Sequence, residues 1–471
     1  MKPFFLVMLA LTALSGCATN PVSGKQDFVM MSESDEIALG KKSDLEARKE
    51  YGVYDSPQLQ SYVDRVGQRL AANSHRPNLQ YHFTVVDSPE VNAFALPGGY
   101  IYITRGILPY LDSEAELAAV LGHEIGHVTA RHAVKQYTAA TAANIGVQIA
   151  SIFVPEINTP GGYDLVNVTG SALLSGYGRE HELEADRLGS EYLARTGYDP
   201  HAMIDVLSVL KNQEQFDIER AKEEHRKPRI YHGLFASHPD SDTRLQQVVD
   251  EAASLQVSPH PVVGKRVYLE HIDGIVFGDS PSQGVVRNNE FLHAGLGIAI
   301  NYPSGWTLRN SPQRLIATNG DSAMALGLAK FQGSPENFLQ DRFGQGELST
   351  FQSRGFSGAI LVFSPRAEAA AIRMGDKLFV IIGSSKTPAD FNLARPEIER
   401  AIHSFHLLSD PERKLARGLK ITVRKAKAGD TFERYAKVSP LGKDAAGYLR
   451  LLNHAYPDGE PHAGDEVKVV E

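Results

Sequence analysis

The 471-residue chain has little of several features that would mark particular protein classes. It contains a single cysteine, Cys17, so no disulfide can form within the chain. No apolar run reaches the roughly 20 residues that a membrane-spanning helix needs. Lysines and arginines are dispersed and the formal net charge is −8, so nothing indicates a nucleic-acid partner. No internal repeat or low-complexity tract is evident.

The composition that remains is typical of a folded, water-facing protein. Hydrophobic residues make up 42% of the chain and charged residues 22%, far from disordered or membrane-spanning composition. At about 100–200 residues per domain, the length predicts two to four domains.

The N-terminus indicates export. Lys2 is followed by a short apolar run, Phe4 to Leu14, whose last residue begins the sequence Leu14-Ser15-Gly16-Cys17. Residues 1–16 are therefore predicted to be a cleaved signal peptide. The sequence Leu14–Cys17 resembles the bacterial lipobox, which implies a lipid on Cys17 and a membrane-anchored protein, with residues 17–34 as its tether. A plain signal peptide with a chance cysteine is the alternative. Ala18 after the cysteine favours the periplasmic face of the outer membrane.

The chain as a whole is predicted to be α+β. Residues 35–257 are mostly helical with strand-like runs at Tyr81–Val86 and Tyr100–Thr104, and residues 262–408 suggest an α/β accessory domain without a recognisable chemical motif. Residues 415–471 contain a strand, two helices and a closing strand. The nearly uncharged stretch Ala139–Val154 is either a helix or loop over a cleft or a membrane contact.

One helix carries a metal-binding pattern. Ser113 and Glu116 form a capping-box signal for a helix from about 114 to beyond 130, and it contains His123-Glu124-Ile125-Gly126-His127. Histidines four residues apart project from one face, as two ligands of a single zinc require. Glu124 lies beside them, where its carboxylate can act as a general base. Glycines at 122 and 126, costly inside a helix, indicate that another element packs closely there.

The third zinc ligand must come from elsewhere in the chain. The metzincin position, six residues after His127, is Ala133. His132 is predicted to lie on the opposite helix face and to be structural. Farther along, Glu182 and Asp186 are one turn apart, so one can bind zinc while the other accepts the N–H of a ligand histidine. Glu180 and Glu184 are interpreted as a solvated acidic face.

Residues 18–255 resemble the gluzincin metallopeptidases of the CAAX-prenyl-protease, HtpX and BepA group, in their bacterial lipoprotein form. The matching motifs are Asn92–Gly99, His123–His127, Arg179–Asp186, and His238-Pro239 with Arg244. The resemblance implies a mostly helical zincin-type domain with a small sheet, one Zn²⁺ per chain, and Glu182 as the third ligand. Asp186 is then the residue that accepts the N–H of a ligand histidine.

The expected reaction is hydrolysis of peptide bonds. An edge strand formed by Gly99, Tyr100, Ile101 and Tyr102 is predicted to pair with an extended substrate, which favours unfolded or misfolded envelope proteins. A structural hairpin without substrate contact is the alternative. By the same resemblance, His238 is predicted to occupy the open metal position as a switch; stabilisation of the oxyanion and a solvent-facing turn residue are the alternatives. Arg244 is predicted to supply a fixed cation for the oxyanion.

The C-terminal residues 415–471 resemble a LysM module, through Ala428–Phe432, Leu451–Asn453 and Ala463–Lys468. The resemblance implies peptidoglycan as a further partner, although a purely structural cap is an equal alternative. Two rival functions remain open: an envelope chaperone or assembly scaffold, and a glycan-binding lipoprotein with little proteolysis.

Overall fold

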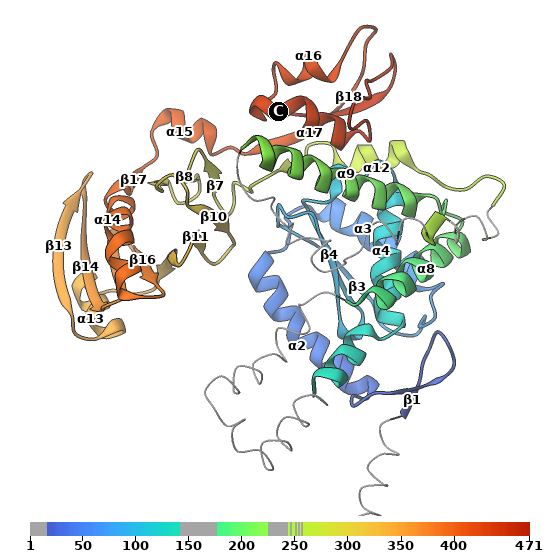
Figure 1. The fold of residues 1–471 in the computed structure, drawn as a ribbon, viewed down its shortest axis with the longest axis horizontal. Coiled ribbons are helices and arrows are strands. Elements are labelled where there is room, and N and C mark those ends of the chain that lie inside the picture. Colours follow the sequence, from blue (N-terminus) through green and yellow to red (C-terminus); the bar gives the residue numbers. More distant parts are fainter. Residues whose placement is uncertain are drawn as a thin grey trace, which may run out of the picture. The chain divides into compact units, whose positions relative to one another are not determined.

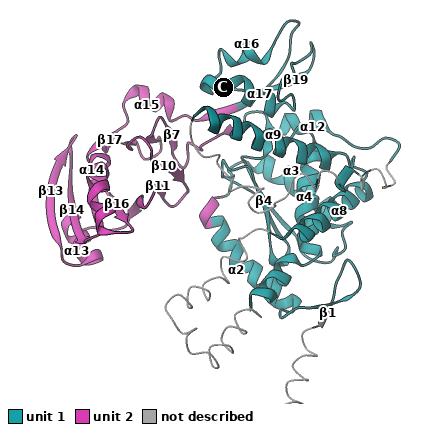
Figure 2. Cartoon of the chain, in the orientation of Figure 1, with its two compact units in different colours: residues 1–48, 53–275, 421–471 teal, residues 49–52, 276–420 magenta. Residues whose placement is uncertain are grey.

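The computed structural model describes residues 17–141, 177–224 and 258–471, together with isolated positions between 244 and 255. The predicted signal peptide, His238 and residues 142–154 of the uncharged stretch lie outside the described residues. The chain divides into two units (Figure 2): unit 1 comprises residues 1–48, 53–275 and 421–471, and unit 2 comprises residues 49–52 and 276–420. Helices and several sheets make the fold α+β, as predicted.

Unit 1 contains the helical region predicted from the sequence (Figure 1). Its helices are α2 (Glu33–Tyr51), α3 (Pro57–Ala71), α4 (Glu114–Thr129), α8 (Arg179–Thr196), α9 (Ala202–Glu223) and α12 (Lys265–Ile272). Its small sheet consists of β3 (His82–Val86), β4 (Ala93–Leu96) and β5 (Tyr100–Thr104). Among the helices of the described ranges, none is both long and apolar enough to cross a lipid bilayer.

The predicted substrate strand is not an edge strand. The order of the sheet is β3-β5-β4, with β5 parallel to β3 and antiparallel to β4. Tyr100, Ile101 and Tyr102 are therefore paired on both sides, and Gly99 belongs to the short 3₁₀ turn Pro97–Gly99 that precedes β5. Strand β4 is an edge strand of this sheet and packs against α4, the helix that carries His123 and His127. A local sequence pattern can predict that residues 100–104 form a strand. It cannot predict which strands pair with β5, because those strands are contributed by other parts of the chain.

Helix α4 is shorter than predicted. Ser113 caps it by accepting a hydrogen bond from the backbone N–H of Glu116, but the helix ends at Thr129. Arg131 then has a φ of 56°, and a second helical segment occupies residues 132–141. Because α4 ends before His132, this residue does not follow the helical phase of His123 and His127. It contacts His127, so its predicted position on the opposite face of the helix is wrong.

The segment predicted to be a tether is partly folded onto the domain. Strands β1 (Cys17–Thr19) and β2 (Gln26–Phe28) form a hairpin. Val29 and Met31 pack against Val134, and the backbone N–H of Met30 donates to Thr138 Oγ1 at 3.0 Å.

Unit 2 is built from antiparallel strands and three helices among the residues described there. A seven-stranded sheet has the order β10-β11-β12-β16-β15-β14-β13, and a four-stranded sheet the order β17-β9-β8-β7. The elements are β6 (Val276–Phe277), β7 (Val285–Arg287), β8 (Glu290–His293), β9 (Ile298–Asn301), β10 (Thr307–Asn310), β11 (Leu315–Asn319), β12 (Ser322–Ala329), α13 (Pro335–Phe343), β13 (Glu347–Ser353), β14 (Phe356–Ser364), β15 (Ala367–Met374), β16 (Lys377–Ser385), α14 (Pro388–Ser404), β17 (His406–Leu407) and α15 (Asp410–Leu415).

The strands of this accessory region pair only antiparallel within its described residues, so its predicted α/β type is wrong. Consecutive strands such as β14, β15 and β16 are joined by short turns, which suit hairpins but are too short for the crossovers that parallel strands need. Trp306 is buried in the core of this unit.

The C-terminal module, residues 421–471, belongs to unit 1. Strand β18 (Leu419–Lys425) pairs antiparallel with β19 (Glu466–Val470), and between them lie α16 (Phe432–Ala436), the 3₁₀ turn Gly442–Asp444 and α17 (Ala445–Leu452). This is the predicted succession of a strand, two helices and a strand. Arg220 on α9 donates to Asp444 at 2.7 Å and to the Tyr448 hydroxyl at 2.6 Å.

A buried lysine of this module lies at the start of α4. Lys468 on β19 is fully buried, and its ammonium donates to the carbonyl of Leu111 at 2.7 Å and pairs with Asp112 at 3.3 Å. His454 donates to the carbonyl of Tyr110 at 2.8 Å and lies 3.4 Å from the Glu116 carboxylate. The module therefore holds the residues from which α4 begins, and its deletion would disturb the metal-site helix.

We predict that Lys468→Met destabilises the full chain by about 3 kcal/mol, because it leaves the Asp112 carboxylate, whose side chain is only 14% exposed, without one of its two lysine partners. Urea denaturation measures the effect. Lys437→Met, at an exposed position of the same module, is the control and should change the free energy of unfolding by less than about 0.5 kcal/mol. Equal midpoints for the two variants would contradict this reading of Lys468.

Candidate metal centre

Two helices approach each other closely to form the centre. A Cβ atom on Gly126 of α4 would lie 2.9 Å from the carbonyl oxygen of Ala185 on α8, and one on Gly122 would lie 3.3 Å from Gly189 Cα. Larger residues at positions 122 and 126 would push α8 away. The close packing that these glycines predicted is therefore present, and α8 is the element responsible.

The predicted zinc ligands converge between these helices. His123 Nε2 and His127 Nε2 are 3.0 Å apart, and they lie 3.6 and 3.5 Å from the two carboxylate oxygens of Glu182. All three side chains are buried. Among the described residues, two groups of histidines and acids have the spacing of metal ligands, and only this one is buried.

The donor set fits a zinc ion. Two imidazole nitrogens and a carboxylate face a common point, an arrangement of lone pairs that is repulsive without a proton or a cation between them. A tetrahedral zinc with bonds of about 2.1 Å keeps its ligand atoms about 3.4 Å apart, close to the observed separations. Two histidines and one glutamate also leave the fourth position open, as in catalytic zinc sites.

His123 is oriented by Asp186. The Nδ1 of His123 lies 2.7 Å from Asp186 Oδ1, the arrangement in which a carboxylate accepts the ligand's N–H and leaves Nε2 for the metal. Asp186 is in turn held by Arg244, whose Nε and Nη2 donate to its two oxygens at 2.7 and 2.8 Å. Burial alone would raise the pKa of Asp186, but the Arg244 guanidinium outweighs it and holds that pKa well below its usual range.

This geometry revises the predicted role of Arg244. Its guanidinium also lies 3.1 Å from a Glu182 oxygen, and the residue is buried. The positive charge therefore acts on the carboxylates that hold the metal site rather than standing open to an oxyanion. The sequence had no signal for this pairing, because Arg244 and Asp186 are 58 residues apart.

His127 is oriented by the residue that had been assigned a structural role. Its Nδ1 lies 2.8 Å from His132 Nδ1, and His132 Nε2 lies 3.1 Å from Glu184 Oε2. Burial lowers the pKa of His132 to about 4, although Glu184 opposes the shift, so this imidazole is neutral at pH 7. The interpretation of Glu184 as part of a solvated acidic face is therefore wrong.

Two further groups near the site were missed. The Tyr177 ring stacks on His127 with centroids 4.0 Å apart. Burial, with the charges of Glu124 and Glu182, raises the pKa of Tyr177 well above its usual range, so the hydroxyl keeps its proton. An aromatic residue ahead of a helix has no distinguishing pattern, so the sequence could not have identified it.

The second missed group is Glu36 on α2, which holds the other end of α4. Its carboxylate accepts from Arg76 at 2.8 Å and from Arg131 at 2.9 Å, while Arg76 also donates to the carbonyl of Val128 at 3.0 Å. The backbone N–H of Gly98, in the turn between β4 and β5, lies 3.4 Å from the same carboxylate. Glu36 thus ties the end of α4 to the turn beside the edge strand.

Glu124, the predicted general base, follows His123 on α4 and is fully buried. Its charge acts on Tyr177 and on Arg244. The roles of His238 remain predictions, because that residue lies outside the described part of the chain.

Comparison with known proteins identifies the region. Residues 57–252 match the model of peptidase family M48. This segment is similar to the members of that family. It contains α3 to α9, and therefore the three ligands and Glu124. The segment is a metalloprotease domain. The matched residues, 57–252, lie within residues 18–255, for which the sequence motifs already indicated a resemblance to gluzincin metallopeptidases.

Several relatives share this region. The beta-barrel assembly-enhancing protease of Yersinia pestis is 30% identical over 256 residues, 53% of this chain and 50% of that protein. That of Escherichia coli K12 is 28% identical over 245 residues, 50% of this chain and 48% of that protein. The mitochondrial metalloendopeptidase OMA1 of Arabidopsis thaliana is 36% identical over 169 residues, 36% of this chain and 33% of that protein. The chain thus spans about half the length, or less, of these relatives.

Proposed function

We propose that the chain is a zinc-dependent endopeptidase that cleaves unfolded or misassembled proteins of the bacterial envelope. The observation that carries the proposal is the buried convergence of His123, His127 and Glu182, with Glu124 on the same helix. His123, His127 and Glu182 would hold one zinc ion per chain. The M48 match over this segment supports the same chemistry.

The reaction needs no covalent bond to the protein. A bound zinc would polarise the scissile carbonyl and make a water more acidic. Glu124 accepts the proton of that water as its oxygen attacks the carbonyl carbon, and then passes the proton to the amine nitrogen as the C–N bond breaks. Asp186 and Arg244 keep His123 and Glu182 in place, so the reacting groups do not have to reorganise.

Substrate binding is assigned to β4 in place of β5. Ala95, Leu96 and Pro97, at the end of this edge strand, line a small cavity together with His127 and Tyr177. An extended peptide that adds to β4 gains backbone hydrogen bonds, and only unfolded segments can adopt that form. The name of the Yersinia pestis relative, a protease that enhances beta-barrel assembly, supports envelope proteins as the substrate class.

We predict that Glu124→Gln retains bound zinc and fold but lowers hydrolysis of an unfolded substrate such as reduced casein by at least 100-fold, because no group then accepts the proton. Peptide release and zinc content are measured on the same preparations. Glu180→Gln, at an exposed position of α8, is the matched control and should remain active. Full activity in Glu124→Gln would refute the assignment, and a cellular phenotype preserved in that variant would favour the chaperone or scaffold alternative.

We also propose that a lipid on Cys17 anchors the protein to the periplasmic face of the outer membrane. The support is the Leu14–Cys17 motif in the sequence. Cys17→Ser should shift the protein from the membrane fraction to the soluble periplasmic fraction, with Ser15→Ala as the control that retains the cysteine. Membrane fractionation unchanged by Cys17→Ser would mean that another segment anchors the chain.

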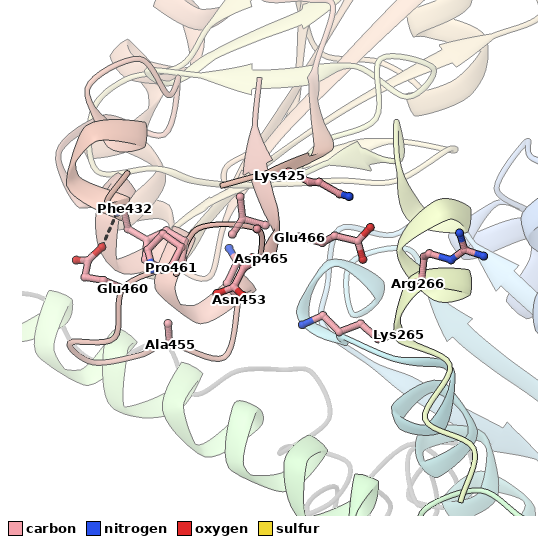
Figure 3. A pocket seen from close by; sticks show the side chains of 12 residues that line it. Lys265, Arg266, Lys425, Phe432, Asn453, Ala455, Glu460, Pro461, Asp465 and Glu466 are labelled. Carbon is pink, nitrogen blue, oxygen red and sulfur yellow. Dashed lines mark hydrogen bonds between the residues drawn. The ribbon is translucent and has the colours of Figure 1, made fainter. Parts of the chain in front are cut away.

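A pocket in unit 1 favours a second activity, binding of peptidoglycan. A cavity of about 550 Å³ lies between the C-terminal module and α12, lined by Phe432, Asn453 and Pro461 with charged side chains at its rim, Glu466 among them (Figure 3). The polar and charged lining of this cavity suits the hydroxyl groups of a sugar chain. Because the module supports α4, the test requires point substitutions rather than deletion.

The full chain should sediment with purified sacculi and be displaced by N-acetylglucosamine oligomers. Glu466→Arg should abolish this sedimentation, because it changes the charge and shape of the rim, while Lys437→Glu outside the pocket should not. A wild-type chain that stays in the supernatant would leave the module with a structural role alone.

A further inference from the structure

A row of hydrogen-bonded side chains leads from one metal ligand to the protein surface. It runs from His127 Nδ1 to His132 Nδ1 over 2.8 Å, and from His132 Nε2 to Glu184 Oε2 over 3.1 Å. The two histidines are buried, whereas 28% of the Glu184 side chain is exposed. The row starts at His127 on α4, passes through His132 beyond the end of that helix, and ends at Glu184 on α8.

The positions of the protons in this row follow from its outer end. A carboxylate can only accept, so the nitrogen of His132 that faces Glu184, Nε2, must carry a hydrogen. In a neutral imidazole the other nitrogen, Nδ1, is then an acceptor. The hydrogen between the two rings must therefore sit on His127 Nδ1, and His127 Nε2 is left with the lone pair that faces His123 and Glu182.

The reverse assignment fails on the same chemistry. If His132 Nδ1 carried the hydrogen, its Nε2 lone pair would face the Glu184 carboxylate 3.1 Å away, two acceptors in contact. His127 would then be protonated on Nε2, the atom on the metal side. The geometry thus permits one neutral arrangement without a repulsive contact, and it is the one that leaves His127 ready to bind a cation.

We propose that His132 and Glu184 are positioning residues that fix the tautomer of His127 and so set the affinity of the chain for zinc. The proposal rests on the proposed function in one respect only, that His127 is a zinc ligand. It assigns His127 an outer partner of a different kind from that of His123, which contacts the Asp186 carboxylate directly.

Helix α8 therefore serves the centre with three acidic residues. Glu182 supplies the ligand, Asp186 one turn later orients His123, and Glu184, about 200° round the helix from Glu182, orients His127 through His132. Ring stacking keeps the imidazoles of the row in place. Tyr177 stacks on His127 at 4.0 Å and His181 stacks on His132 at 4.2 Å, each with nearly parallel planes.

Zinc affinity is the direct test, measured by competition with a chromophoric chelator on the full chain. All variants carry Glu124→Gln, so that self-cleavage does not interfere. His132→Ala should weaken zinc binding by about 10- to 100-fold, the usual loss when the outer partner of a ligand histidine is removed. Glu184→Ala should weaken it in the same direction, and Glu184→Gln, whose amide oxygen still accepts, should restore most of the affinity.

A double-mutant cycle tests whether Glu184 acts on His127 through His132, the relay proposed here, or has only a general structural role. Because Glu184 acts through His132, the double variant His132→Ala/Glu184→Ala should bind zinc no more weakly than His132→Ala alone. Glu180→Ala, exposed on the same helix, should match the parent. Thermal unfolding of the metal-free proteins identifies any variant that loses affinity by losing its fold.

Nitrogen-15 NMR of the histidine rings supplies a readout that is independent of affinity. The parent should show His132 with its proton on Nε2 and His127 with its proton on Nδ1, and Glu184→Ala should allow His132 to populate the other tautomer. Additive losses in the cycle, affinities within twofold of the parent, or a proton on His132 Nδ1 in the parent would each overturn the relay. A parent that binds no zinc would instead refute the proposed function.

Discussion

The close approach of α4 and α8 is the constraint on which the metal centre depends. Gly122 and Gly126 remove the side chains that would hold the helices apart, and a Cβ at Gly126 would lie 2.9 Å from an α8 carbonyl oxygen. A side chain as short as glutamate reaches two histidines on a neighbouring helix only when the backbones nearly touch. The glycines lower the stability of the helix, but they allow the backbones of α4 and α8 to approach closely enough for Glu182 to reach both histidines.

Both ends of α4 are fixed from outside the helix pair. At its start, the buried Lys468 and the partly exposed His454 of the C-terminal module bind the residues that precede the helix. At its end, Glu36 and its two arginines hold the last turn and the residues that follow it. Rotation of α4 would move both ligand histidines, so these contacts protect the ligand geometry. The C-terminal module is thus part of the support of the site as well as a surface with its own pocket.

The features that could be predicted from the sequence are those that depend on local periodicity. A regular helix carries its phase, so the positions of His123, His127 and Glu124 on one face of α4 followed from spacing alone. The phase argument failed for His132, because α4 ends at Thr129 and Arg131 has a left-handed backbone conformation (φ 56°). Spacing also says which face a residue occupies but not what covers that face, so it could not show His132 lying against Glu184. For the same reason β5 was predicted as a strand, but its central place in the sheet depends on non-local pairing with β3 and β4.

The central claim is that these two helices create a three-ligand zinc site. X-ray absorption at the zinc edge of the loaded full chain tests it most directly, because it reports the identity and distance of the ligand atoms without requiring a substrate. The account predicts one zinc per chain with nitrogen and oxygen ligands at about 2.0–2.2 Å, a signal from two imidazoles, and loss of the bound zinc on Glu182→Ala. A sulfur ligand, a third imidazole, or full zinc occupancy in Glu182→Ala would contradict it.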